Sequence, residues 1–298
     1  MRRALLIMNP EARGVTPAIA RVVEAALEAR FKLEKVKTEA RQAATQATRE
    51  AVENGAELVV AFGGDGLVNE VVNGIAGLEA TLAIVPGGTM NVLARNLGIP
   101  KDPVEATDRI LRSADSPPRQ IRLGAANGHY FTFACGCGFD AEAAAWVEAH
   151  RASKQRFGEP YFYAAGFLTF LKSYSGRRPF LLCEGEFGRV EAVMAAALNT
   201  ATYAYLAGRP VRLGSASAVD PRLDLFILRR MKLVHLPAYV TGALFTGRYG
   251  PESATLTGVN SYTVSSEEPF AFHLDGEPMT PTERVEVVVA REVLRILL

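Results

Sequence analysis

The stretch FGGDGLVNEVVNG, residues 62–74, combines residue types that could bind a phosphate. Gly63 and Gly64 follow an apolar run, and glycines let backbone N–H groups approach an anion closely. Helical spacing begins at Gly66, and a helix N-terminus adds a partial positive charge. Asp65 would repel a bare phosphate, so its position favours a nucleotide that brings Mg²⁺, held by Asp65 directly or through water.

Two better-known phosphate loops do not match this stretch. A Walker A loop needs a Gly-Lys pair, and the chain contains none. The dinucleotide fingerprint fails because Asn69 stands where its third glycine belongs. A dinucleotide-dependent oxidoreductase is therefore disfavoured.

A second stretch, VPGGTMNVLARNLGI at 85–99, repeats the design. An apolar run leads to Gly87 and Gly88, and Thr89 and Asn91 open the next helical pattern. One such turn alone is ordinary turn chemistry. Two of them on successive strands, both with polar residues at the helix start, favour an anion site.

The elements that position these loops alternate between strand and helix patterns. Helical patterns start at Pro17 and cover 41–54, and strand patterns lie at 4–8, 31–37, 58–62 and 82–86. Such alternation predicts an α/β domain with a doubly wound, mainly parallel sheet and helices on both faces. Sheets of this kind bind ligands at the carboxyl ends of their strands.

The pattern changes at Pro117-Pro118. Asn127-Gly128 indicates a hairpin between two strand patterns, and 180–198 indicates another that turns between Gly185 and Gly188. Further strand patterns lie at 223–229, 262–266, 270–274 and 284–290, and helical patterns at 158–174 and 233–247. A second, β-rich and mainly antiparallel domain is predicted. The apolar end, 292–298, must dock on the folded chain.

Composition restricts the class of protein. The 298 residues are 49% hydrophobic and carry a net charge of +1, so no whole-molecule field singles out nucleic acid as a partner. Three cysteines do not make a disulfide framework, and Cys135 and Cys137 are expected to be small buried residues. The apolar run near the start is too short for a signal peptide or a membrane span, so a soluble cytoplasmic protein is expected.

The paired glycine loops together resemble the diacylglycerol kinase catalytic domain, in the bacterial lipid kinase branch. This family includes sphingosine and ceramide kinases and is distantly related to NAD kinases. The resemblance runs along most of the chain: Asn9-Pro10 is similar to the first nucleotide loop, GCGFDAE (136–142) to the entry motif of the second domain, and HLDGEP (273–278) to the late catalytic motif.

The resemblance implies an NAD kinase/diacylglycerol kinase-like fold. Residues 1–122 would bind ATP, 123–290 would bind the lipid substrate, and 291–298 would return to the first domain. ATP and Mg²⁺ are the implied cofactors. The implied nucleotide-binding residues are Asn9, Pro10, Thr38, Gly63, Gly64, Asp65, Gly66, Asn69, Glu70, Gly87, Gly88, Thr89 and Asn91. Leu67 departs from the family, which usually has Thr there, so altered nucleotide affinity is expected.

Asp275 is the implied catalytic base. An apolar strand pattern delivers it to a strand end, and a carboxylate of ordinary acidity is ionised at neutral pH and accepts a hydrogen bond from an alcohol. Glu277 is implied as its partner or as a ligand of metal-bound water. The alternative is that Asp275-Gly276 is simply a turn.

A structural Mg²⁺ is implied at Asp220, with the backbone carbonyls of Ser217 and Arg222 contributing. Val219 and Pro221 stand where the resemblance implies Asp and Gly, so this stretch departs from the family pattern. The alternative is a polar turn before the strand at 223.

The segment 150–178 carries six Lys or Arg residues and one Glu around an apolar stretch. It could contact an anionic membrane surface during turnover, or form a core helix with a solvated basic rim. The sequence thus predicts an ATP- and Mg²⁺-dependent lipid kinase acting on a membrane lipid. An NAD kinase-like enzyme and a non-catalytic nucleotide- or lipid-binding protein are the alternatives. The sequence names neither the lipid nor the oligomeric state, for which a homodimer is one option.

Overall fold

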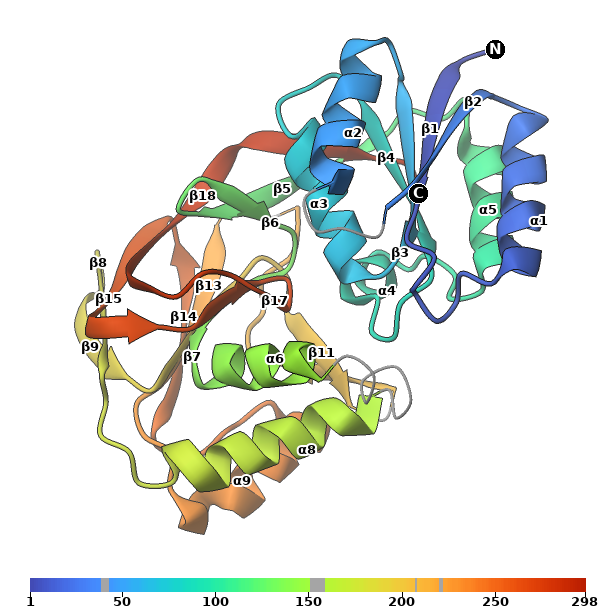
Figure 1. Cartoon of the computed structure of the whole chain (residues 1–298). Helices are drawn as coiled ribbons and strands as arrows, with labels where there is room; N and C mark the ends of the chain where they lie inside the picture. Colours follow the sequence, from blue (N-terminus) through green and yellow to red (C-terminus); the bar gives the residue numbers. More distant parts are fainter. Residues whose placement is uncertain (39–42, 151–158, 207, 220–221) are drawn as a thin grey trace. The chain divides into compact units, whose positions relative to one another are not determined.

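The computed structural model describes residues 1–38, 43–150, 159–206, 208–219 and 222–298 (Figure 1). The chain divides into two compact units. Unit 1 consists of Met1–Arg122 together with Arg291–Leu298, and unit 2 is Leu123–Ala290.

The sheet of unit 1 is parallel. Its strands are β1 (Arg3–Met8), β2 (Lys32–Lys37), β3 (Leu58–Gly63), β4 (Thr81–Pro86) and the end of β18 (Thr282–Ile296). Their order is β2-β1-β3-β4-β18, and every neighbouring pair is parallel. β3 and β4 are buried along their whole length, as continuous apolar strands covered on both faces should be. The predicted α/β architecture is confirmed.

Helices cover both faces of this sheet (Figure 1). They are α1 (Pro17–Glu28), α2 (Ala43–Glu53), α3 (Asp65–Ile75), α4 (Val92–Asn96) and α5 (Pro103–Ser113). α1 packs beside α5 and α2 beside α3. On the α1–α5 face, Leu27 and Ile110 join Leu6 and Val60 of the sheet in one buried cluster.

Two helices of unit 1 differ from the sequence prediction. α4 is five residues long and ends at Asn96, so the pattern after the second glycine pair makes only a short helix. α5 was not predicted, because its buried stripe is made of small or polar Ala106 and Thr107 with a single large residue, Ile110. Its start is nevertheless marked by Asp102, whose Oδ1 accepts the backbone N–H of Val104 at 2.9 Å.

Unit 2 is mainly antiparallel. Its strands are β5 (Arg119–Ala126), β6 (His129–Phe131), β7 (Ala134–Gly138), β8 (Leu181–Gly185), β9 (Gly188–Ala192), β10 (Met194–Leu198), β11 (Thr202–Leu206), β12 (Arg209–Arg212), β13 (Leu223–Leu228), β14 (Ser253–Val259), β15 (Ser261–Phe270), β16 (Phe272–Leu274), β17 (Glu277–Pro278) and most of β18. The order β14-β13-β10-β7-β16-β17 makes one sheet, and β18-β15-β8-β9 run side by side in the other.

Both predicted hairpins are present, with one correction. β5 pairs with β6 across Asn127-Gly128, and β8 pairs with β9 through Glu184 and Arg189. The stretch predicted to complete the second hairpin continues past Ala192 into β10, which belongs to the other sheet. The strand changes sheets there because the buried residues of β10 pair with β7 and β13 instead.

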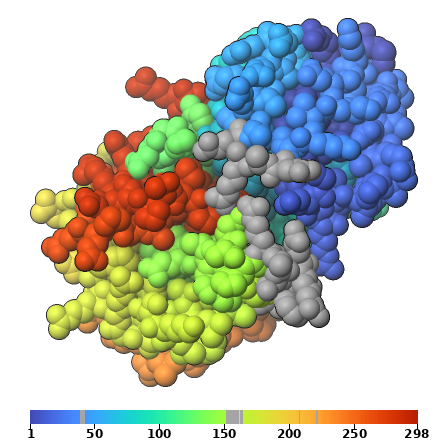
Figure 2. Space-filling view, viewed as in Figure 1, coloured from blue at the N-terminus to red at the C-terminus, as the bar shows by residue number. Residues whose placement is uncertain are grey.

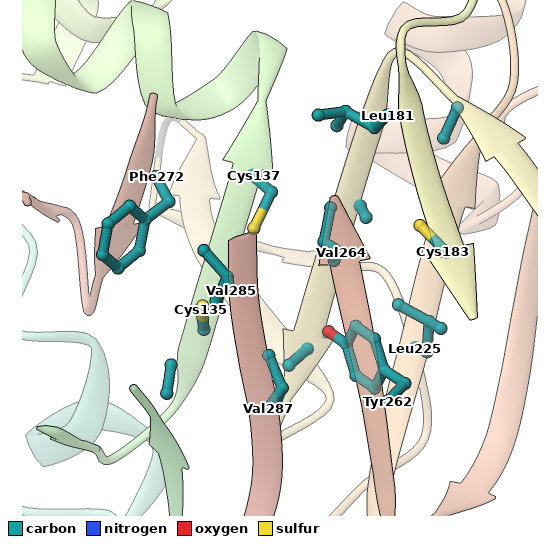
Figure 3. Close-up of a cluster of buried hydrophobic side chains, with 14 of the residues drawn as sticks. Cys135, Cys137, Leu181, Cys183, Leu225, Tyr262, Val264, Phe272, Val285 and Val287 are labelled. Atoms are coloured by element: carbon teal, nitrogen blue, oxygen red, sulfur yellow. The ribbon is translucent and has the colours of Figure 1, made fainter. Parts of the chain in front are cut away.

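One buried cluster joins the two sheets of unit 2 (Figure 3). Cys135 and Cys137 of β7 and Cys183 of β8 lie in it as free, buried thiols near Val264 and Val285. Burial raises the pKa of the Cys183 thiol from 9.0 to about 12. The expectation that the cysteines at 135 and 137 are small core residues is confirmed.

The helices of unit 2 are α6 (Phe139–Ala149), α8 (Glu159–Thr169), η1 (Phe170–Tyr174), η2 (Leu233–His235), α9 (Leu236–Thr241) and η3 (Gly242–Thr246). The helical pattern predicted over 233–247 is thus three short pieces, since Pro237 and Gly242 lie inside it. α6 was not predicted. Within the described ranges no helix combines the length and the apolar character needed to cross a bilayer.

The apolar end of the chain completes the first sheet. After pairing with β15, strand β18 continues until Arg295 and Ile296 pair in parallel with Thr81 and Leu82 of β4. The backbone N–H of Leu297 then donates to the Leu82 carbonyl at 2.8 Å, and the Leu297 side chain is buried in the core of unit 1.

Candidate active site

Backbone hydrogen bonds tie together three loops at the carboxyl ends of β1, β3 and β4. The N–H of Gly14 donates to the Gly87 carbonyl at 2.8 Å, and the N–H of Gly87 donates to the Gly63 carbonyl at 2.7 Å. The N–H of Asn9 donates to the Phe62 carbonyl at 3.2 Å. The structure therefore brings the Asn9 loop and both predicted glycine loops to one edge of the parallel sheet, where open α/β sheets bind ligands.

The glycine pairs allow the loops to touch each other. A Cβ atom on Gly88 would lie 2.5 Å from the Cα of Gly64, and one on Gly87 would lie 2.8 Å from a methyl carbon of Val15. Real Cβ atoms do not make such contacts. Contact between loops is thus a second reason for glycine here, in addition to the close approach of an anion.

Asp65 joins the two loops. Its Oδ1 accepts the backbone N–H of Val92, the first residue of α4, at 2.7 Å. Asn91, the residue before α4, adopts a left-handed backbone with φ 49°. Its side chain accepts the N–H of Gly88 at 3.0 Å and donates to the Gly88 carbonyl at 2.8 Å. Two predicted ligands of the nucleotide therefore also build the loop that would bind it.

A cavity of about 220 Å³ lies beside the second glycine loop. It is lined by Gly14, Ile19, Pro86, Gly87, Gly88, Thr89, Met90, Asn91, Arg95, Lys101 and Pro103. Neither Arg95 nor Lys101 was among the predicted nucleotide-binding residues, although Arg95 lies on the helix predicted after the second glycine pair. Arg95 follows Asn91 by one helical turn, which is a usable signal, whereas Lys101 lies beyond α4 and has none. The Thr89 hydroxyl and the two cations suit the charge of a phosphate group.

The other predicted nucleotide ligands surround this edge. Asn9 accepts the N–H of Glu11 at 2.9 Å, which shapes the turn that contains Pro10. Thr38 follows the end of β2 and is buried, with its N–H bonded to the Met8 carbonyl at 2.9 Å. Asn69 accepts the side-chain amide of Asn73 at 3.2 Å.

Glu70 and Gly66 belong to α3. The Oε2 of Glu70 accepts the N–H of Ala44 at 3.2 Å, in the first turn of α2, so this carboxylate stabilises a helix start. Gly66 lies in the first turn of α3. Leu67, at the position where the resemblance implied Thr, is buried and packs against Gly63. An apolar contact thus stands where a hydroxyl was expected.

Asp275 occupies a buried turn of unit 2. Its backbone is left-handed, with φ 51°, and only 3% of the residue's surface is exposed. Oδ2 accepts the N–H and the hydroxyl of Thr132 at 2.7 and 2.8 Å, and Oδ1 accepts the N–H groups of Phe133 and Ala134 at 2.9 and 3.1 Å. The carboxylate thus clamps the 132–134 segment, and an acceptor alcohol would have to displace one of these donors.

A buried polar cluster supports the same turn. The ring of His273 accepts the N–H of Gly276 at its Nδ1 at 3.2 Å, so in the neutral ring Nε2 carries the proton. That Nε2 lies 2.8 Å from the Tyr203 hydroxyl and 3.1 Å from Oδ2 of Asp140. The Tyr203 hydroxyl also donates to Asp140. Burial first, and then the charge of Asp140, raises the pKa of Tyr203 well above its usual value.

The motif GCGFDAE supplies Asp140 to this cluster and places Gly136 beside the His273 ring, whereas the sequence had suggested no role for either residue. A Cβ on Gly136 would lie 2.5 Å from Nε2 of His273, so glycine makes room for the ring. Asp140 lies in the first turn of α6, where a carboxylate is favoured by the helix dipole. Its Oδ1 is buried without a hydrogen-bond partner in the described structure. The sequence signal that could have identified Gly136 and Asp140 is the GCGFDAE motif, which contains both residues.

The remaining predicted residues lie elsewhere in unit 2. Glu277 pairs with Leu274 between β17 and β16 and is half-buried. Asp220 and Pro221 lie outside the described residues. Ser217 and Arg222 flank that gap, and the nearby carboxylate of Asp224 accepts the N–H groups of Ser215 and Ala216 at 2.6 and 2.8 Å. The described residues contain no group of three or more His, Cys, Asp or Glu arranged for a metal ion.

Comparison with known proteins agrees with this architecture. A family model described as the diacylglycerol kinase catalytic domain matches residues 3–124. Over 96% of its length the chain is 30% identical to a diacylglycerol kinase of Bacillus subtilis (strain 168), covering 94% of that protein. The chain belongs to the bacterial diacylglycerol kinase family. It is also 31% identical, over 79% of its length and 75% of the relative, to a protein of Pseudomonas aeruginosa (strain UCBPP-PA14) named as a YegS-like lipid kinase.

Solved structures of this kinase family and of a distant relative share the fold. The crystal structure of a diacylglycerol kinase from Bacillus anthracis superposes with a TM-score of 0.70 at 24% identity, covering 99% of this chain and 96% of that one. An NAD kinase from Archaeoglobus fulgidus, solved in complex with ATP, gives a TM-score of 0.56 at 10% identity, with 99% and 93% covered. The predicted kinship with diacylglycerol kinases and NAD kinases is confirmed at the level of fold.

Proposed function

We propose that this member of the diacylglycerol kinase family is an ATP- and Mg²⁺-dependent lipid kinase that phosphorylates the hydroxyl of a diacylglycerol-like lipid. The observation that carries the proposal is the pair of glycine loops joined at one sheet edge, beside a cavity with Arg95 and Lys101 in its lining. The N-terminus of α3, a hydroxyl and cations form an anion site of the kind that phosphoryl transfer needs.

In unit 1 the residues around the cavity would hold the phosphates. Thr89 offers a hydroxyl, and Arg95 and Lys101 offer positive charge, whereas the N–H groups of Gly87 and Gly88 are bonded within the loops. Asp65, fixed by its bond to Val92, would orient metal-bound water. When bound, ATP supplies the phosphoryl group and Mg²⁺ offsets the phosphate charge.

In unit 2 Asp275 would accept the proton of the lipid hydroxyl. Among the described residues, the N–H and hydroxyl of Thr132 and the N–H groups of Phe133 and Ala134 hold its carboxylate in place. Of these donors, the Thr132 hydroxyl can rotate away without moving the backbone. The lipid hydroxyl would replace this donor at Oδ2. Glu277, two residues later and half-buried, would assist as a second carboxylate.

The acceptor lies in a membrane, so the enzyme would work in the cytoplasm with peripheral contact to an anionic membrane surface. The basic stretch that was predicted for this contact runs from 150 to 178. Its residues 151–158 lie outside the described structure, and residues 159–174 form α8 and η1.

The direct test is transfer of label from γ-labelled ATP to a total membrane lipid extract, with Mg²⁺ and with excess EDTA. Wild type should label one lipid class in a metal-dependent reaction, and Glu277→Gln should lower the rate at least tenfold. Val22→Ser, on the exposed face of α1, is the matched control and should keep the wild-type rate. A nucleotide-binding protein that labels no lipid would contradict the proposal, and NAD would then be the next acceptor to assay.

A further inference from the structure

Exposed apolar side chains concentrate on two helical segments of unit 2. Among the described residues, seven of the eleven large hydrophobic side chains that are exposed lie on α8–η1 or on η2–α9–η3. We call these seven the apical surface: Phe167, Leu168, Leu171, Leu233, Val234, Val240 and Phe245. Val234 is 76% exposed and Phe245 is 70% exposed, so these two are barely covered by the fold.

The two segments that carry the apical surface are joined. The rings of Phe170 and Tyr239 meet edge to face at 6.2 Å between centroids, and Ser175 forms a parallel bridge with Met231. The N–H of Gly176 donates to the Met231 carbonyl at 2.8 Å. In Figure 1 the yellow-green α8 and the orange α9 lie together at one end of unit 2, and in Figure 2 atoms of these two colours are adjacent there.

The charges around the apical surface are mostly positive. Residues 229–248 contain Arg229, Arg230, Lys232 and Arg248 and no acid, and 160–178 contain three further cations, although α8 itself begins at Glu159. Lys232 is paired with Glu252 at 2.7 Å, and Arg177 with Glu142 at 3.4 Å. Arg229, Arg230 and Arg248 are exposed. The guanidinium of Arg209 lies 5.5 Å from the ring centre of Phe245, so another cation lies beside this exposed apolar side chain.

Apolar side chains among cations are the pattern of a segment that lies in the headgroup region of an anionic bilayer. α9 and η3 have six and five residues, so they can lie at a membrane surface and cannot cross it. An acidic protein partner would match the cations but would leave Val234 and Phe245 without a reason to be apolar. A second copy of the chain would bring like charges together.

We propose that the apical surface docks on an anionic lipid bilayer, with Val234 and Phe245 entering the interface and Arg229, Arg230 and Arg248 contacting lipid phosphates. This inference deepens the proposed function and rests on it, since a membrane-resident alcohol is the acceptor there. It adds the 229–248 segment, whereas the sequence had pointed only to 150–178.

The test is co-sedimentation of the full chain with vesicles, without nucleotide. Vesicles of phosphatidylcholine alone are compared with vesicles that contain one third phosphatidylglycerol, at low and high salt. Wild type should bind the anionic vesicles at least tenfold better, and high salt should weaken binding. The double variant Val234→Ser/Phe245→Ser should lose at least tenfold in affinity. The matched control is Val22→Ser/Val104→Ser, two exposed valines of unit 1, which should bind as wild type does.

The outcomes separate docking from catalysis. Equal losses in both double variants, or binding that ignores lipid charge, would overturn the docking proposal. So would a change from dimer to monomer in Val234→Ser/Phe245→Ser with vesicle binding unchanged, because a second copy would then cover the surface. Phosphorylation of a short-chain, water-dispersed diacylglycerol should be equal in all three proteins. If none of the three proteins phosphorylates the short-chain diacylglycerol while binding to anionic vesicles is intact, the kinase proposal is contradicted and the docking proposal is not.

Discussion

The carboxylate of Asp65 accepts a hydrogen bond of 2.7 Å from the backbone N–H of Val92. Twenty-seven residues separate the two, yet this bond connects the helix start after the first glycine loop to the helix start after the second. An acid at an anion-binding edge therefore has a structural purpose that does not depend on a metal. Any proposed metal role for Asp65 has to be tested apart from this bond.

Asp65→Asn and Asp65→Ala separate the two roles. Asn keeps an oxygen that can accept the Val92 N–H, whereas Ala leaves that N–H unpaired and should lower the free energy of unfolding by about 1–3 kcal/mol. Both remove the charge, so both should reduce Mg²⁺-dependent transfer. Urea unfolding and a Mg²⁺ titration of activity measure the two effects. Wild-type Mg²⁺ dependence in a stable Asp65→Asn protein would show that the carboxylate does not organise the metal.

Gly88→Ala should disturb the joined loops. The added Cβ would lie 2.5 Å from the backbone Cα of Gly64, so one loop must move. We expect at least a tenfold loss of nucleotide affinity, together with a loss of about 1–3 kcal/mol of stability. Gly166→Ala is the matched control, because a Cβ there meets nothing within 4 Å. Equilibrium binding of ATP compares them, and equal affinities would mean that loop contact does not shape the site.

Asp275→Asn is predicted to weaken the fold as well as the chemistry. An amide NH₂ would face backbone N–H donors at one of the two carboxylate positions, which should cost about 2–4 kcal/mol of stability. Thr132→Val removes one donor and should leave the protein folded. If Asp275 is the base, Thr132→Val should retain at least a tenth of wild-type transfer while Asp275→Asn retains less than a thousandth. Comparable losses in the two would favour a purely structural role for Asp275.

His273 is predicted to position the Asp275-Gly276 turn through the 3.2 Å bond from the Gly276 N–H. His273→Asn keeps an acceptor near Nδ1, and His273→Leu does not. Asn should therefore rescue most of kcat relative to Leu, with KM for ATP unchanged in both because the nucleotide loops lie in unit 1. Steady-state kinetics with circular dichroism of both variants gives the comparison. A change in KM for ATP alone would contradict this role.

Alkaline pH should destabilise unit 2. Burial raises the pKa of Cys183 from 9.0 to about 12, so between these values the unfolded chain has lost a proton that the folded chain keeps. The stabilising contribution is therefore complete below pH 9 and is lost as pH rises through about 12, with a slope of up to about 1.4 kcal/mol per pH unit. Cys183→Ala should show a shallower fall in stability between pH 9 and pH 10.5. Parallel curves for the two proteins in urea unfolding would refute this.

The sequence by itself determined the local elements and the loops of the first sheet. Strand and helix periods depend on neighbours along the chain, so β1, β3, β4 and α1 could be predicted from apolar spacing alone. The glycine pairs at the ends of β3 and β4 could be recognised as one binding site from the sequence, because a parallel sheet places the carboxyl ends of successive strands at one edge. Helix α5 was not predicted from the sequence, because small and polar residues make up most of its buried stripe.

Only the tertiary structure decided what the polar residues touch. Asp275 is held by residues about 140 positions earlier, Asp140 meets His273 across 133 positions, and the chain end pairs with β4. Such contacts depend on which strands become neighbours, and strand order carries no local signal in the sequence. Glu70 was predicted beside the nucleotide, and the fold places its carboxylate at the start of α2 because two distant helices pack together.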